Sequence, residues 1–278
     1  MRRRFMNSSE DIYKPFYIEA LEDGVAFSFG YELEYRVDGG EWITLPSNTF
    51  SESINKGSRM YISGRYISET KDSFDIRGLC KLGGDLKSIS YANNAKDITT
   101  LSVYGQYWYL FRDCTSIVEV ESNLLSYVDT LSKYCYDSMF YGCTSLVNAP
   151  ELPAIELDLY CYSSMFYGCT SLVNAPELPA IELAGNCYSY MFNGCTSLVN
   201  APELPAIKLA GDCYSYMFNG CTKLNYIKAL FTTIPSGSYT SNWVKGVASS
   251  GTFVKNKNAT WDVRGVNGIP TGWTIKTE

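Results

Sequence analysis

Apolar and polar positions recur with a fixed period of 26 residues across the middle of the chain. The units read CYDSMFYGCTSLVNAPELPAIELDLY, CYSSMFYGCTSLVNAPELPAIELAGN and CYSYMFNGCTSLVNAPELPAIKLAGD, followed by the partial unit CYSYMFNGCTKLNYIK. The first two units are identical at 22 of 26 positions. A period of this length predicts a solenoid, in which each unit is one supersecondary element stacked on the next.

The spacing of apolar residues within the unit 161–186 predicts its local structure. Cys161, Met165 and Phe166 fit one short helical turn with a single buried face. Residues 171–178 are rich in proline and predict a short strand, and residues 180–183 predict a second extended run. We expect each unit to bury Met, Phe, Cys, Leu and Ile side chains. An outward row of tyrosines is expected at Tyr136, Tyr162, Tyr188 and Tyr214.

The flanking segments follow other patterns. Residues 15–78 contain short runs of alternating apolar and polar residues between turn residues, which predict a small antiparallel β-sandwich domain. Residues 79–134 resemble degenerate first units, so the predicted solenoid spans residues 79–230. Residues 1–14 predict a flexible basic arm containing Arg2, Arg3 and Arg4. Residues 231–278 predict a C-terminal capping region, with a short helix at 239–247. The expected fold class is a β-rich α/β solenoid.

Three tryptophans near the C-terminus, Trp243, Trp261 and Trp273, have no counterpart in the full repeats. One interpretation is a hydrophobic cap that closes the open end of the solenoid against water. The other is an aromatic platform that binds sugar. Both interpretations remain open at the level of sequence.

Charge and composition narrow the expected function. The formal net charge is −6, and residues 101–230 hold 12 Asp and Glu against 5 Lys and Arg. An acidic array does not attract phosphate backbones, so we expect no nucleic-acid partner. The chain contains no histidine, which removes the commonest general base and the histidine-containing zinc sites. We therefore expect no enzymatic activity, catalytic residues, cofactor or metal.

The sequence also gives expectations about membranes and targeting. No apolar run approaches the length of about 20 residues that a membrane helix needs, so no membrane partner is expected. The basic start is not followed by the apolar run of a secretory signal. We expect synthesis in the host cytoplasm.

Ten cysteines require an explanation, and eight of them lie at two repeated positions of the unit. The spacing within a unit matches no common zinc pattern, in which paired cysteines lie two to four residues apart. Cysteines in adjacent units would be about 5 Å apart, within reach of a disulfide. Alternatively, they form a ladder of buried thiols that behave as small hydrophobic groups.

The recurring pattern Met-Phe-x-Gly-Cys-Thr-Ser-Leu-x-x-Ala-Pro-x-Leu-Pro-Ala resembles the BspA-like leucine-rich repeats, over about residues 105–230. The flanking segments look like those of proteins encoded by gut Bacteroides and their crAss-like phages. The resemblance implies a right-handed leucine-rich-repeat stack that serves adhesion or ligand recognition. Secreted BspA-like surface proteins carry signal peptides, which this chain does not show. The resemblance therefore favours a virion component, with a bacterial cell-surface adhesin as the alternative.

The leading hypothesis is a non-enzymatic phage tail or fibre-associated protein that recognises a host cell-surface glycan or protein. Its N-terminal domain would contact other virion proteins. A homo-oligomer is possible, but the sequence shows no coiled-coil heptads that would indicate one. Candidate ligand-binding positions face outward or differ between units. They are Glu151, Glu177, Glu203, Glu182, Lys208, Tyr190, Trp243, Trp261 and Trp273.

Two other functions are alternatives to binding. A structural spacer or decoration protein is favoured by the near-identity of the units. A depolymerase would need a pair of carboxylates in a cleft, whereas the sequence offers glutamates repeated along a surface.

Overall fold

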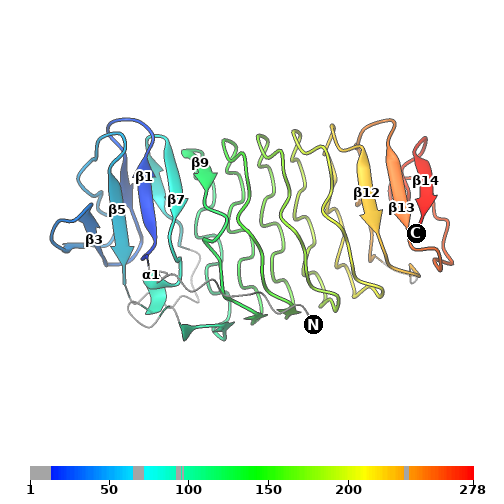
Figure 1. Ribbon diagram of the computed structural model, residues 1–278, viewed down its shortest axis with the longest axis horizontal. Coiled ribbons are helices and arrows are strands. Elements are labelled where there is room, and N and C mark those ends of the chain that lie inside the picture. The colour runs from blue at the N-terminus through cyan, green and yellow to red at the C-terminus, as the bar shows by residue number, and fades with distance from the viewer. Residues whose placement is uncertain (1–13, 65–71, 92–94, 96, 235–237) are drawn as a thin grey trace, which may run out of the picture.

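The protein is an elongated β-rich solenoid with almost no helix, as shown by a computed structural model (Figure 1). The structure describes residues 14–64, 72–91, 95, 97–234 and 238–278. Residues 1–13, which make up nearly all of the predicted basic arm, lie outside the described residues. The expectation of a β-rich repeat stack is confirmed.

The N-terminal region forms a six-stranded sheet and a separate two-stranded sheet. In the larger sheet the strands follow the order β4-β3-β5-β1-β7-β9. Their bounds are β1 Tyr17–Ala20, β3 Leu33–Val37, β4 Ile43–Leu45, β5 Arg59–Ser63, β7 Cys80–Gly83 and β9 Ile117–Val120. The smaller sheet pairs β2 (Ala26–Ser28) with β6 (Asp75–Arg77) in antiparallel orientation. Because apolar and polar residues alternate, strands such as β5 bury Met60 and Ile62 on one face.

The larger sheet continues directly into the solenoid. Strand β7 pairs antiparallel with β1 on one side and parallel with β9 on the other. Parallel bridges then join Asn148, Asn174 and Asn200 of successive units. The ladder continues through β12 (Tyr226–Ala229), β13 (Thr252–Lys255) and β14 (Thr274–Thr277), which are also parallel. One hydrophobic core therefore runs through the N-terminal region and the repeats.

A second side of the solenoid carries a short parallel sheet. Its three strands are β8 (Thr100–Leu101), β10 (Thr130–Leu131) and β11 (Glu156–Leu157). Thr130 pairs with both Thr100 and Glu156, so equivalent residues of three successive units lie side by side. The α-helix α1 (Ser88–Tyr91) precedes this sheet in the chain and is the sole α-helix of the described residues.

The third side is a ribbon of overlapping turns. Positive φ angles recur at alternate residues, for example at Tyr160 (63°), Tyr162 (61°) and Ser164 (52°). A right-handed helix requires negative φ at every residue, so this segment cannot be helical. The helical turn predicted for residues 161–166 is therefore wrong.

Backbone hydrogen bonds hold successive ribbons together. The Ser164 N–H donates to the Ser189 carbonyl at 2.8 Å, and the Gly168 N–H donates to the Asn193 carbonyl at 2.7 Å. Between these bonds lie turns closed within a single unit, such as the Met165 N–H to the Tyr162 carbonyl at 3.2 Å. The ribbon thus satisfies its backbone groups by alternating bonds inside a unit with bonds to the next unit.

Columns of equivalent side chains fill the interior of the stack. Phe166 lies between Phe140 and Phe192, with ring centroids 5.8 and 5.7 Å apart and planes within 8° of parallel. The Met, Cys and Leu positions of the unit form similar buried columns. All ten cysteines are free thiols, which agrees with the buried-thiol interpretation.

Two expectations about the core are wrong. The tyrosines expected in an outward row are buried, because the ribbon directs this position inward; they are Tyr136, Tyr162, Tyr188 and Tyr214. The isoleucines expected inside are exposed, and Ile181 has 66% of its surface accessible. The adjacent Ala180 takes the inward position instead, since neighbouring residues of an extended run face opposite sides.

The segment 239–247 is a further ribbon and not the predicted helix. The Tyr216 N–H donates to the Ser241 carbonyl at 2.8 Å, and the Phe218 N–H donates to the Trp243 carbonyl at 2.8 Å. Trp243 therefore occupies the place that Met217 holds in the preceding unit. The 26-residue register persists here although the repeat letters have changed.

Candidate ligand-binding surface

The row of glutamates at Glu151, Glu177 and Glu203 faces solvent, as expected from the sequence. Its last member differs from the others because Glu203 forms an ion pair of 3.0 Å with Lys228. Lys228 also forms an ion pair with the side-chain carboxylate of Glu278. The row thus carries unpaired negative charge only toward its N-terminal end.

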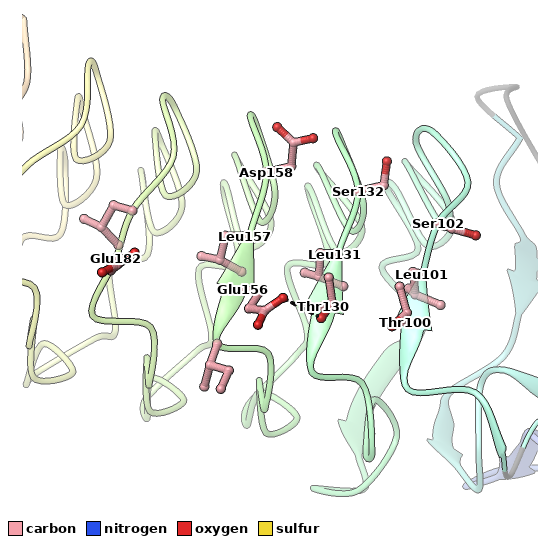
Figure 2. Close-up of a pocket in the computed structure, with 12 residues that line it drawn as sticks. Thr100, Leu101, Ser102, Thr130, Leu131, Ser132, Glu156, Leu157, Asp158 and Glu182 are labelled. Carbon is pink, nitrogen blue, oxygen red and sulfur yellow. Dashed lines mark hydrogen bonds between the residues drawn. The ribbon is translucent and has the colours of Figure 1, made fainter.

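The other two charged candidates, Glu182 and Lys208, lie in different environments. Glu182 lines an open groove together with Glu156, the equivalent residue of the preceding unit, whereas the exposed Lys208 lies outside it. The groove has a volume of about 620 Å³ and runs over β8, β10 and β11 (Figure 2). Lys208 therefore replaces the glutamate of the two preceding units at a point beyond the groove.

The groove repeats the same chemistry along successive units. Figure 2 shows Thr100, Thr130, Glu156 and Glu182 following one another in a row, with Ser102, Ser132 and Asp158 in a second row. Leucines of the three strands lie between the two rows. The Thr130 hydroxyl donates to a Glu156 carboxylate oxygen at 3.0 Å. The groove offers hydroxyls and carboxylates to a ligand that lies along the axis of the stack.

Exposed tyrosines form three short stacks on the ribbon side. The rings of Tyr134 and Tyr160 are 4.6 Å apart and parallel within 3°. Tyr141 and Tyr167 have the same geometry, at 4.6 Å and 3°. Tyr190 stacks on the ring of the next unit, Tyr216, at 4.6 Å and 2°. These side chains are partly exposed, and Tyr190 is the most accessible of the site residues on this side, at 36%.

One tyrosine of each stack has a phenol pKa raised above its usual value, and these are Tyr134, Tyr141 and Tyr190. Partial burial, together with the neighbouring Tyr104 and Tyr160 hydroxyls, raises the pKa of Tyr134. The pKa of Tyr190 is raised by burial, by the nearby Tyr216 and Tyr167 hydroxyls and by the Asp212 carboxylate. These phenols therefore present uncharged donors and acceptors beside apolar surface, a combination suited to binding polar but neutral ligands.

The three tryptophans lie inside the C-terminal end of the stack and are not part of an exposed platform. Their accessible fractions are 0% for Trp243, 6% for Trp261 and 4% for Trp273. Each indole N–H donates to a backbone carbonyl: Trp243 to Gly268 at 2.8 Å, Trp261 to Phe231 at 3.0 Å and Trp273 to Ala248 at 2.8 Å. Burial of the ring faces removes these residues from the candidate surface.

The described residues hold no group of three or more His, Cys, Asp and Glu side chains that could bind a metal. Burial raises the pKa of the repeated thiols, to about 12 for Cys213 and Cys221, so they are poor nucleophiles at neutral pH. Within the described part of the chain, no helix is long and apolar enough to span a bilayer.

Sequence reasoning found some of these positions and missed others. It identified Tyr190 and Glu182, but it missed the stacks formed by Tyr134, Tyr160 and their partners. The signal was present: tyrosine occurs just before the first cysteine in two successive units and is replaced by Asn186 and Asp212 afterwards. No family model, curated protein or solved structure matches the chain.

Proposed function

We propose that this chain is a non-enzymatic binding or adhesion protein that recognises a repetitive ligand on a cell surface, such as a polysaccharide. The observation that carries the proposal is the set of three parallel tyrosine stacks, with rings 4.6 Å apart, on the exposed ribbon side. Aromatic rings with polar edges provide contact area at low entropic cost, which makes them frequent in binding surfaces.

The finer features inferred from the sequence belong to the same proposal. They are a BspA-like leucine-rich-repeat stack with an N-terminal β-sandwich, a C-terminal cap and a place in a phage virion. The outer edge of the six-stranded sheet supports a role in attachment to other virion proteins. There Trp42 and Ile43, beside and within the edge strand β4, are 40% and 46% exposed.

Binding of the purified chain to a glycan array and to cell envelopes of gut Bacteroides tests this function. Retention on envelopes that is competed by soluble surface polysaccharide is the expected result. No retention on either support would contradict a recognition function.

The near-identity of the units favours a second candidate, a structural spacer or decoration protein. A solenoid whose length depends on repeat number needs no variation between units, because each unit contacts mainly its neighbours. A spacer would assemble into its particle and show no retention on glycans or envelopes.

A further inference from the structure

None of the three tyrosine stacks runs the length of the solenoid. At one junction between neighbouring ribbons, the tyrosines change from the two outer positions of the ribbon to its middle position. In the ribbons of Tyr134 to Gly142 and of Tyr160 to Gly168, tyrosines occupy the two outer positions and a serine occupies the middle. In the next two ribbons, a tyrosine occupies the middle and Asn or Asp residues occupy the outer positions. The change happens once, between the ribbon of Tyr160 to Gly168 and the ribbon of Asn186 to Gly194.

Backbone hydrogen bonds place these two ribbons side by side. The Tyr160 N–H donates to the Gly185 carbonyl at 3.1 Å, and the Ser164 N–H donates to the Ser189 carbonyl at 2.8 Å. In this register Asn186 holds the position in the second ribbon that Tyr160 holds in the first. At the other end of the ribbon, Asn193 holds the position equivalent to Tyr167. The Tyr134–Tyr160 and Tyr141–Tyr167 stacks therefore end here, and the Tyr190–Tyr216 stack begins.

Ring faces become available where a stack ends. Inside a stack, each face is covered by the parallel ring of the neighbouring unit. At the junction, the residues equivalent to Tyr160 and Tyr167 in the next ribbon are not aromatic, so no ring of the same stack covers the C-terminal face of either tyrosine. The residue equivalent to Tyr190 in the preceding ribbon is Ser164, so the N-terminal face of Tyr190 has no stacked ring either. Amide and hydroxyl groups of Asn186, Asn193 and Ser164 fill the intervening positions.

The junction carries no formal charge. Residues 159–176 and 183–202 contain no Asp, Glu, Lys or Arg. The surrounding carboxylates are Asp158 and Glu182, which line the groove on the neighbouring side of the solenoid, and the exposed Glu177. Asp212 of the next unit also lies close enough to Tyr190 to contribute to its raised pKa. An anionic ligand would gain no ion pair at the junction and would be repelled by the groove, so the surface selects against acidic ligands.

We infer that this tyrosine junction binds one neutral pyranose residue of a glycan chain. Its residues are Tyr160, Ser164, Tyr167, Asn186, Tyr190 and Asn193. The C–H face of the sugar would lie against aromatic surface while its hydroxyls exchange hydrogen bonds with the two amides and with Ser164. The inference rests on the proposed function and names its ligand class and its place on the repeat array.

Substitutions borrowed from neighbouring units test the junction with little risk to folding. Tyr190→Ser restores the serine that preceding units carry at this position and removes the central ring. We expect about tenfold or greater loss of affinity for a neutral polysaccharide, measured by titration calorimetry. Tyr127→Ser is the matched control, because Tyr127 is 60% exposed and lies outside the junction. It should bind like the wild type.

A quadruple variant moves the junction without removing it. Asn186→Tyr, Tyr190→Ser and Asn193→Tyr together give the second ribbon the outer tyrosines and middle serine of the first. Asp212→Asn then supplies the amide that borders the junction at its new place. Both outer stacks then extend by one unit and meet Tyr216 at the next boundary. We expect this variant to recover most of the affinity that Tyr190→Ser loses, and circular dichroism should report the same fold and melting temperature for all variants.

The outcomes separate the two proposals. If the wild type binds glycans or envelopes and Tyr190→Ser binds equally well, the junction is overturned while the proposed function stands. Tighter binding to acidic than to neutral polysaccharides would also overturn it. If the wild type binds neither array nor envelopes, both proposals fail.

Discussion

The Cys169 thiol donates a hydrogen bond to the backbone carbonyl of Phe140, with an Sγ to oxygen distance of 3.1 Å. Cys143, Cys195 and Cys221 make the same contact to the carbonyls of Phe111, Phe166 and Phe192, at 3.0 to 3.1 Å. The repeated thiol is therefore a hydrogen-bond donor between units as well as a core group.

This contact predicts an order of stability among substitutions of Cys169. Cys169→Ala removes the donor and leaves a small void, which should lower the free energy of unfolding by about 1–2 kcal/mol. Cys169→Ser keeps a donor of similar size, so we expect a smaller loss. Urea denaturation of the two variants measures the difference. A serine variant less stable than the alanine variant would mean that the position matters only as an apolar group.

Alkaline pH should destabilise the protein through its buried thiols. Burial raises the pKa of Cys114, Cys135, Cys213 and Cys221 to about 12, from a usual value of 9.0. Above pH 9 the unfolded chain releases these protons while the folded chain retains them, so unfolding becomes more favourable as the pH rises. Each such thiol contributes about 1.4 kcal/mol per pH unit between the two pKa values. Urea midpoints measured from pH 8 to 11 should fall steeply above pH 9, and a flat profile would contradict burial of the thiols.

Two apolar residues of one repeat unit should respond very differently to truncation. Phe166 is fully buried between two parallel rings, so Phe166→Ala should lower the free energy of unfolding by about 3–5 kcal/mol. Ile181→Ala removes a side chain that is 66% exposed and should change stability by less than about 0.5 kcal/mol. Thermal melting of both variants checks the pair. An unchanged melting curve for Phe166→Ala would remove that ring from the core.

The sequence was sufficient to predict a β-rich repeat stack but not the course of the backbone within a unit. Repetition of Cys, Met, Phe and Leu at fixed positions predicted the buried columns, because identical units can only bury their apolar faces against each other. The spacing of Cys161, Met165 and Phe166 also fits a helical turn, and periodicity alone cannot distinguish that turn from a ribbon with alternating φ. Since tyrosine rarely adopts positive φ, nothing local indicated the conformation of Tyr160 and Tyr162.

The same ambiguity explains the errors at the candidate surface. In a ribbon with alternating φ, inward and outward positions differ from those of a helix, so Tyr162 was expected outside and is buried. The letters around Trp243 differ from the repeat, so the sequence pattern places this residue outside it. Its distance of 26 residues from Met217, and the retained Gly246, are the signals that fit the backbone pairing, in which Trp243 stands in the place of a buried methionine. Tyr190 was selected because it differs between otherwise identical units, a criterion that does not depend on the conformation, and its side chain is exposed.

Deletion of single units tests whether recognition depends on the junction or on the length of the array. Removing residues 135–160 joins Tyr134 to Cys161, so Tyr134 replaces Tyr160 and the junction keeps its composition. Removing residues 161–186 joins Tyr160 to Cys187 and puts a tyrosine where Asn186 stood. Both deletions remove one 26-residue unit and preserve the register of the stack.

We expect the first deletion to bind a neutral polysaccharide within about twofold of the wild type, and the second to lose about tenfold in affinity. The reason is that only the second deletion replaces a polar amide of the junction with a third ring beside Tyr190. Titration calorimetry on both proteins, with melting temperatures as the folding control, makes the comparison. Equal losses would mean that affinity follows the number of units, as expected for a ligand that contacts the whole array.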